Sequence, residues 1–326
     1  MIRLLTGVLL SAVACAPAIC QSSTPTAQKA DAAQIADLNL EKPDVLRLIA
    51  LNEAAARSGK ASHADPKSVV IFYKNLGILY AYGGMPFKSE DAIRRAIALL
   101  KNGPQDQLAQ EIGKLAVLHA AMNKVRQAEK EELQVLQIRE TLGDPVEIAR
   151  AQSALGGLYD AEEKYSQGLS YAQKAYDVLA DRSDVDVPDR VGVRHTLGYA
   201  LTATRDCDPG IRVLRDALDL ARVDPGVGQM SVGYSEFVLG TGYWHCDDRV
   251  NASKWLELGT TDMKADYGWG RAMYVNAMKQ YARFLRQDGR QEAALSAEAV
   301  VNQAQSVVDA STLADTAKGF RSSGSQ

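Results

Sequence analysis

The sequence predicts an all-α protein in which pairs of helices repeat along the chain. Three observations support this prediction. A short phrase returns at a nearly constant step, each copy is followed by a second stretch with helical spacing, and strand-like alternation of useful length is lacking. Phe, Trp and Tyr together make up only 6% of the residues, which is unlike an aromatic-rich β-sandwich.

The repeated phrase is Leu-Gly or Leu-Ala, two variable residues, and then a large side chain. It begins at Leu76, Leu115, Leu155, Leu197 and Leu239, and a weaker copy begins at Tyr281. The steps are therefore 39, 40, 42, 42 and 42 residues. A fixed period of this length is typical of a repeat array. We expect six two-helix units, and residues 44–58 should form a further helix that caps the array, because terminal repeats need a polar outer face.

Small residues mark the second helix of each unit. They stand at the same offsets from the phrase in the third, fourth and fifth units: Gly168, Ala172 and Ala175; Gly210, Leu214 and Ala217; Ala252, Leu256 and Gly259. Offsets of four and three residues fall on one face of a helix. Since glycine inside a helix costs ~1 kcal/mol relative to alanine, its recurrence indicates close approach between helices. Asp-Pro pairs at 65–66, 144–145 and 224–225 predict the starts of first helices, and the pair at 208–209 that of a second helix.

These features together resemble the tetratricopeptide repeat family over about residues 66–308. The resemblance rests on the Leu-Gly-x-x-Tyr phrase, the turn glycines Gly84 and Gly289, and the small residues of the second helix. The step exceeds the usual unit of about 34 residues and is similar to the longer units of kinesin light chains and some bacterial regulators. The resemblance implies a right-handed superhelical solenoid over residues 43–310. Pro86, His119 and Tyr281 depart from the family pattern.

The first 20 residues are typical of a secretory signal peptide. Arg3 precedes the apolar run Leu4–Ala14, and small residues follow before Gln21. The apolar run is shorter than the ~20 residues that a membrane-spanning helix needs. We expect export to the periplasm or the medium, with an uncut anchor or a lipid-anchored form through Cys15 as alternatives. Residues 21–42 read as a flexible leader and residues 311–326 as a loose tail, and no membrane span is expected after cleavage.

Two cysteines remain after the predicted signal peptide, Cys207 and Cys246. They lie near the turns of the fourth and fifth units, and equivalent turns of neighbouring units lie side by side in such an array. An even pair in an oxidising compartment favours one disulfide. Two free thiols are the alternative.

Composition and motifs exclude several functions. Lys and Arg number 37 against 40 Asp and Glu, a net charge of −3, which argues against a nucleic-acid binder. We find no phosphate loop, no nucleophile elbow and no His-Glu-x-x-His motif. The run His245-Cys246-Asp247-Asp248 lacks further ligands at zinc spacing, so a polar turn with a disulfide is the favoured interpretation. The sequence predicts neither an enzyme nor a cofactor.

The favoured function is a protein-interaction scaffold that binds a partner protein or peptide on the concave face of the array. A regulatory or sensor module for a small ligand or signal peptide is the alternative, and an enzyme on a helical scaffold is the least favoured. The resemblance implies that first helices line the groove. The predicted partner-binding residues are Arg150, His195, Tyr199, Tyr234, Phe237, Trp244, His245, Lys279, Arg283 and Arg286. Packing of the aromatic residues against neighbouring helices, with solvated basic residues, is the alternative.

Overall fold

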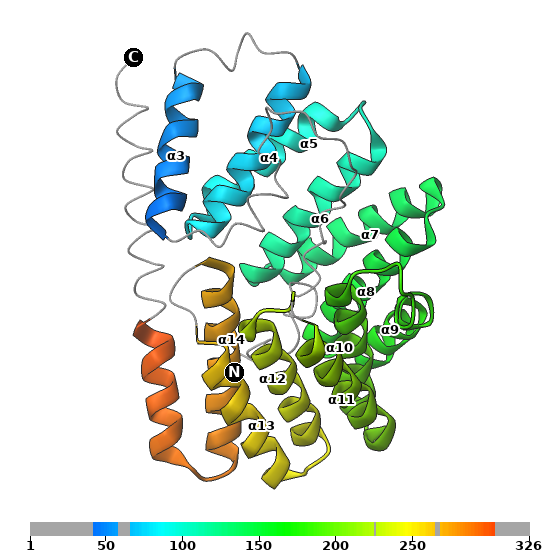
Figure 1. The fold of residues 1–326 in the computed structure, drawn as a ribbon, viewed down its shortest axis with the longest axis vertical. Helices are drawn as coiled ribbons and strands as arrows, with labels where there is room; N and C mark the ends of the chain where they lie inside the picture. The colour runs from blue at the N-terminus through cyan, green and yellow to red at the C-terminus, as the bar shows by residue number, and fades with distance from the viewer. Residues whose placement is uncertain (1–41, 58–65, 225, 265–267, 304–326) are drawn as a thin grey trace. The chain divides into compact units, whose positions relative to one another are not determined.

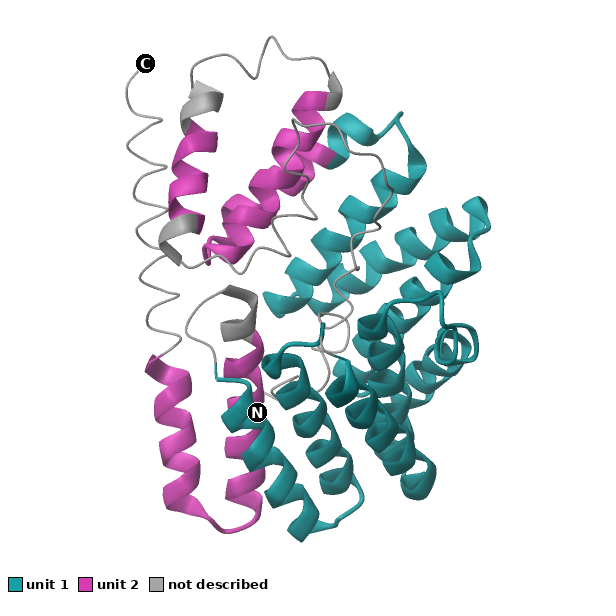
Figure 2. Ribbon diagram, viewed as in Figure 1, with its two compact units in different colours: residues 1–27, 97–265 teal, residues 28–96, 266–326 magenta. Residues whose placement is uncertain are grey.

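The protein folds into helices joined by short turns (Figure 1). The computed structural model describes residues 42–57, 66–224, 226–264 and 268–303, and in these ranges every regular element is a helix, which confirms the all-α prediction. The predicted signal peptide, almost all of the leader and the tail lie outside the described residues. The chain divides into two compact units, one built around residues 97–265 and the other of residues 28–96 and 266–326 (Figure 2).

The unit around residues 97–265 consists of four helix pairs. In chain order its helices are α6 (Gln105–Ala121), α7 (Val125–Leu142), α8 (Pro145–Ala161), α9 (Tyr165–Leu179), α10 (Val187–Ala203), α11 (Cys207–Val223), α12 (Gln229–His245) and α13 (Arg249–Asp262). Each first helix packs against the second helix of its own pair, and α8, α10 and α12 also contact one another in succession (Figure 1). Successive pairs therefore share a continuous core, as a repeat array requires.

The other unit contains α3 (Lys42–Arg57), α4 (Pro66–Tyr82), most of α5 (Pro86–Leu100), α14 (Gly268–Gln287) and a helical stretch over residues 291–303. The helix predicted at residues 44–58 corresponds to α3. It buries Val45 and Ile49 against α4, and the hydroxyl of Tyr80 donates a hydrogen bond of 2.9 Å to Glu53. In α3, therefore, an apolar stripe packs on the next helix while a carboxylate fixes its position.

The turn inside each pair repeats with the same period as the sequence phrase. One residue per turn has a positive φ: Gly84, Asn123, Glu163, Arg205, Asp247 and Gly289. These positions are again 39, 40, 42, 42 and 42 residues apart. The outermost turns use glycine, for which this conformation carries no steric cost, whereas the four inner turns place side chains there at about 1–2 kcal/mol each. The backbone thus confirms the six predicted units.

Helix starts agree with the Asp-Pro signals in part. Asp144 caps α8 by accepting a hydrogen bond of 2.9 Å from the backbone N–H of Val146, with Pro145 at the first helical position. The prediction at 208–209 was wrong by two residues, because α11 begins at Cys207. The prediction at 224–225 was wrong by four, because α12 begins at Gln229 and Asp224 instead accepts a hydrogen bond from the N–H of Gly226. Aspartate also stabilises turns of this kind, so the dipeptide signal does not separate the two uses.

Close approach at the predicted small residues is a general feature of the helix pairs. A methyl group on Gly198 of α10 would lie 3.0 Å from the carbonyl oxygen of Gly210 in α11. Placed on Gly210, it would lie 3.0 Å from the same atom of Gly198. The two backbones therefore touch, which confirms the packing reason inferred for the repeated glycines.

Candidate functional site

The predicted partner-binding residues divide between the two units. Those on α8, α10 and α12 belong to the unit around residues 97–265, whereas Lys279, Arg283 and Arg286 lie on α14 in the other unit. Arg283 and Arg286 are exposed, and Arg286 forms a bidentate ion pair with Glu298, with both N···O distances 2.6 Å. The guanidinium that was predicted to hold a partner's carboxylate already holds a carboxylate of its own chain.

The aromatic part of the predicted groove is buried. His195, Tyr199, Tyr234 and Phe237 are 1%, 5%, 3% and 2% exposed. Every residue of α10 from 191 to 200, and every residue of α12 from 233 to 243, is buried. The expectation that these four residues line an open groove is therefore wrong. Their spacing in the sequence does place them on one face of the first helices, but neighbouring first helices pack against that face.

Arg150 belongs to a chain of alternating charges that crosses the helix pairs. Arg139 of α7 pairs with Asp106 of α6 and with Glu147 of α8, the latter at 2.7 Å. Arg150 pairs with the same Glu147 and with Asp189 of α10, where its Nε lies 2.7 Å from Oδ2. Since its guanidinium is taken up by Glu147 of its own helix and by Asp189 of α10, Arg150 ties α8 to α10 instead of meeting a partner.

A group of two half-buried and two buried side chains lies where the turns of neighbouring pairs meet. We call Tyr165, Tyr199, Thr202 and His245 the turn-end cluster. The His245 ring lies edge-on to the Tyr199 ring at 4.7 Å between centroids and 6.5 Å from the Tyr165 ring. Its Nδ1 lies 3.3 Å from the hydroxyl oxygen of Thr202. Tyr165 and His245 are half-buried, as is the neighbouring Trp244, so the cluster presents aromatic and imidazole surface toward solvent.

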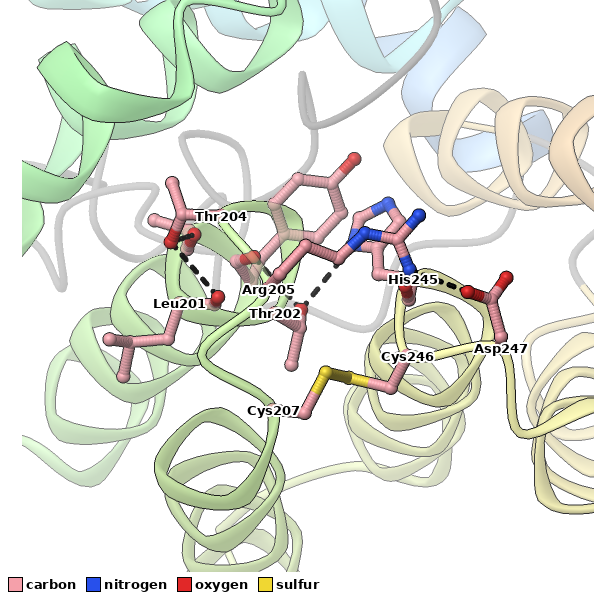
Figure 3. Close-up of a disulfide and its surroundings, with 10 residues drawn as sticks. Leu201, Thr202, Thr204, Arg205, Cys207, His245, Cys246 and Asp247 are labelled. Carbon is pink, nitrogen blue, oxygen red and sulfur yellow. Dashed lines mark hydrogen bonds and ion pairs between the residues drawn. A yellow bond between two sulfur atoms is a disulfide. The ribbon is translucent and has the colours of Figure 1, made fainter.

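A disulfide and an ion pair fix the turns beside this cluster. Cys207 and Cys246 are bonded, with their Cα atoms 5.8 Å apart (Figure 3). Arg205 donates a hydrogen bond to the backbone oxygen of His245 and one of 2.7 Å to Asp247 (Figure 3). The start of α11 and the end of α12 are thereby tied at several points within a few residues.

Tyr165, Thr202 and Arg205 were missed by sequence reasoning. Tyr165 begins a second helix, and the search for groove residues considered first helices alone. Arg205 occupies the turn position that is glycine in the first and last pairs (Gly84 and Gly289), and a charged residue there is the signal that was available. Arg205 and Asp247 are equivalent positions one period apart, so their opposite charges lie in the turns of neighbouring pairs.

The structure offers no site for a metal in the part of the chain that it describes, since no group of three or more His, Cys, Asp or Glu side chains is placed to bind an ion. The acidic run after His245 is used structurally. Cys246 is in the disulfide, Asp247 pairs with Arg205, and Asp248 caps α13 by accepting a hydrogen bond of 3.1 Å from the N–H of Asn251. No described helix is both long and apolar enough to cross a membrane.

Asp160 is a buried carboxyl group in the third helix pair. It is 0% exposed, it lies against Gly168 of α9, and neither carboxylate oxygen has a hydrogen-bond partner. Burial alone raises the pKa of Asp160 well above its usual value. The folded state binds the proton of this carboxyl group more tightly than the unfolded state does. The contribution of the group to the stability of the fold therefore falls as the pH rises.

We expect Asp160→Thr, which introduces the residue found at the same position of the next pair (Thr202), to stabilise the protein. The gain at neutral pH should be about 1–3 kcal/mol, the penalty for an unsatisfied buried polar group. It should shrink as the pH falls toward ~4, the ordinary value for aspartate, because the carboxyl group of the unfolded chain then also begins to hold its proton. Urea unfolding at pH 4 and 7 measures the difference. The exposed Asp216→Thr serves as the control, and an equal effect of both substitutions would contradict the prediction.

The helix pairs, their left-handed turns and their period define the class: the chain has the fold of tetratricopeptide-like helical repeat proteins. The crystal structure of the apo form of RapI is similar, with a TM-score of 0.65 and 14% identity over 81% of this chain and 93% of that one. A Rap protein complexed with competence and sporulation factor gives 0.63 and 12% over 82% and 72%. Aspartyl phosphate phosphatase F from Bacillus subtilis gives 0.58 and 15% over 74% and 61%. No protein-family model and no curated protein matches the sequence.

Proposed function

We propose that the chain is a non-catalytic scaffold that binds a partner protein or an extended peptide at the turn-end cluster. The observation that carries this proposal is the meeting of the half-buried Tyr165 and His245 with the buried Tyr199, from three successive helix pairs. Aromatic side chains contribute much of the binding energy at protein interfaces, because they bring large rigid surfaces at a low cost in side-chain entropy.

Rigidity of the surroundings supports the same proposal. The disulfide and the contacts of Arg205 hold the ends of α10 and α12 in place on either side of the cluster (Figure 3). A surface that is already ordered loses little conformational entropy on binding, and more of the contact energy then appears as affinity. The buried residues of α10 and α12 pack between the helices, so they support the cluster and do not contact the partner.

Similarity of fold also supports a binding role. One of the similar structures is a Rap protein complexed with competence and sporulation factor, so this kind of helical array accommodates a binding partner. The basic residues of α14 remain a separate prediction for partner contact in the other unit.

We also propose that the protein is exported. The expected signal peptide at residues 1–20 and the disulfide between Cys207 and Cys246 support this part of the proposal, because disulfides persist mainly in oxidising compartments. Detection of the chain, shortened at its N-terminus, in a periplasmic or culture fraction tests it. Full-length protein confined to the cytoplasm would contradict it.

Capture of a partner from cell-envelope extract tests the binding surface. With the captured protein identified and quantified, we expect His245→Ala and Tyr165→Ala each to lower the amount retained about tenfold or more, the effect of removing a residue worth ~1.4 kcal/mol of binding energy. Val223→Ala is the matched control, because Val223 is 77% exposed and lies at the opposite end of α11 from Cys207. Undiminished retention by correctly folded His245 and Tyr165 variants would refute the proposed surface.

A further inference from the structure

His195 is an isolated polar side chain between two helix pairs. It stands in the middle of α10, is 1% exposed, and neither of its ring nitrogens has a hydrogen-bond partner. Its ring meets that of Tyr234 on α12 edge-to-face, with 5.3 Å between the centroids. Buried polar atoms without partners are rare in folded proteins, so a role for this one is worth seeking.

The repeat shows what the same position contains elsewhere. Ser153 and Phe237 are the equivalents of His195 in the preceding and following pairs. The hydroxyl of Ser153 lies 3.3 Å from that of Thr196, and Phe237 is buried. The position therefore accommodates a hydroxyl or an apolar ring, and the fourth pair alone of these three has a group there whose ordinary pKa lies near neutral pH.

No charged group of the surrounding helices is bonded to the His195 ring, and the unpaired Asp160 of α8 lies against Gly168 of α9. Helices α8, α9, α11 and α12 pack against α10. Three ion pairs take up other charged groups of these helices: Arg150 of α8 with Asp189 of α10, Arg194 of α10 with Asp181 after α9, and Arg222 of α11 with Glu236 of α12. Lys174 of α9 lies over the ring of Tyr171, and Arg215 of α11 donates to the hydroxyl of Tyr243.

Burial is the one cause that acts on His195, and it lowers the pKa of the imidazole to about 3.

We propose that His195 is an acid-sensitive latch that holds α12 against α10 while its ring is neutral. Uptake of a proton places an unpaired positive charge in the buried contact with Tyr234, and the contact opens to let the ring reach water. Because the disulfide joins Cys207 to Cys246, the ends of the helices near the turn stay together. The opening is therefore confined to the other end, where α10 begins at Val187 and α12 at Gln229.

The direction of the effect follows from linkage. The closed state has the lowered pKa, so it binds fewer protons than the open state, in which the ring has an ordinary value of about 6.5. As the pH falls below this ordinary value, the ratio of open to closed molecules rises about tenfold per pH unit. The rise ends near the pKa of the closed state, about 3.

Hydrogen exchange of the full chain at pH 7, 6 and 5, corrected for intrinsic exchange rates, tests the latch. We expect protection of the amides of α12 in the wild type to fall relative to His195→Phe, approaching about tenfold per pH unit below pH 6. His195→Phe introduces the residue of the next pair, and His195→Gln replaces it if the larger ring does not fold. Val223→Ala is the control, because it changes an exposed position of α11 that has no titratable group and should leave the wild-type dependence on pH unchanged.

Two results would overturn the latch. The first is a protection ratio between wild type and the His195 variants that stays constant with pH. The second comes from nuclear magnetic resonance of histidine-labelled protein: a His195 ring that titrates near pH 6.5 while the α12 amides stay protected.

Discussion

Replacing Gly259 with alanine is expected to lower the free energy of unfolding by about 3 kcal/mol, at the upper end of the range for overpacking. A methyl group at this position in α13 would lie 2.5 Å from the backbone nitrogen of Phe237 and 2.6 Å from the carbonyl oxygen of Gly233, both in α12. Backbone atoms of a helix do not move aside as a flexible side chain does. The two helices must separate, and the buried contacts along their length weaken.

The repeat explains why alanine is tolerated at the equivalent positions. Ala175 faces Ala149 in the third pair and Ala217 packs with Val191 in the fourth, whereas Gly259 faces Gly233 in the fifth. Two glycines in register let the backbones of α12 and α13 approach more closely than two larger residues do.

Gly113→Ala in α6 is the matched control for this prediction. A methyl group there meets a single atom of Val135, at 3.9 Å, so we expect a gain of about 1 kcal/mol from helix propensity alone. Urea unfolding followed by circular dichroism measures both variants. A Gly259→Ala protein as stable as the wild type would show that α12 and α13 are not in backbone contact.

Removing the disulfide is expected to have an effect of similar size. The double substitution Cys207→Ser with Cys246→Ser leaves no unpaired thiol at this site and opens a link between residues 39 apart in the sequence. The unfolded chain then regains the conformational freedom that the link removed, which for a loop of this length lowers the free energy of unfolding by about 3–4 kcal/mol.

Reduction provides the control for the disulfide. The wild-type protein with reductant should unfold at the same denaturant concentration as the double variant, and reductant should not change the variant. If oxidised wild type and the variant unfold together, or if mass spectrometry finds both thiols free, the link does not contribute in solution.

The repeat architecture was predictable from the sequence because it depends on periodic positions. The phrase beginning at Leu155 and Leu197, and small residues such as Gly168 and Gly210, recur at a fixed step, so each additional copy strengthens the inference. The same reasoning located Cys207 and Cys246 in neighbouring turns, where the structure joins them. Local signals were less reliable, since the aspartate before Pro225 stabilises a turn instead of starting α12.

The candidate site was less predictable, because it depends on which face of a helix is covered. Tyr234 and Phe237 have the residue types of a binding surface, yet α10 and α12 are buried along most of their length. Periodicity assigns residues to one face and does not say whether another helix lies against that face. Tyr165 and His245 come together from different helix pairs through the turns, and their meeting depends on the angle between pairs, which no spacing in the sequence records.

Photo-crosslinking tests the central claim, partner binding at the turn-end cluster, most directly. A photoreactive phenylalanine derivative replaces Tyr165 in one variant and the exposed Val223 in another, and both are irradiated with the captured envelope partner. We expect a covalent complex with that partner from position 165 and none from position 223. Equal crosslinking from both positions, or crosslinking from position 223 alone, would contradict it.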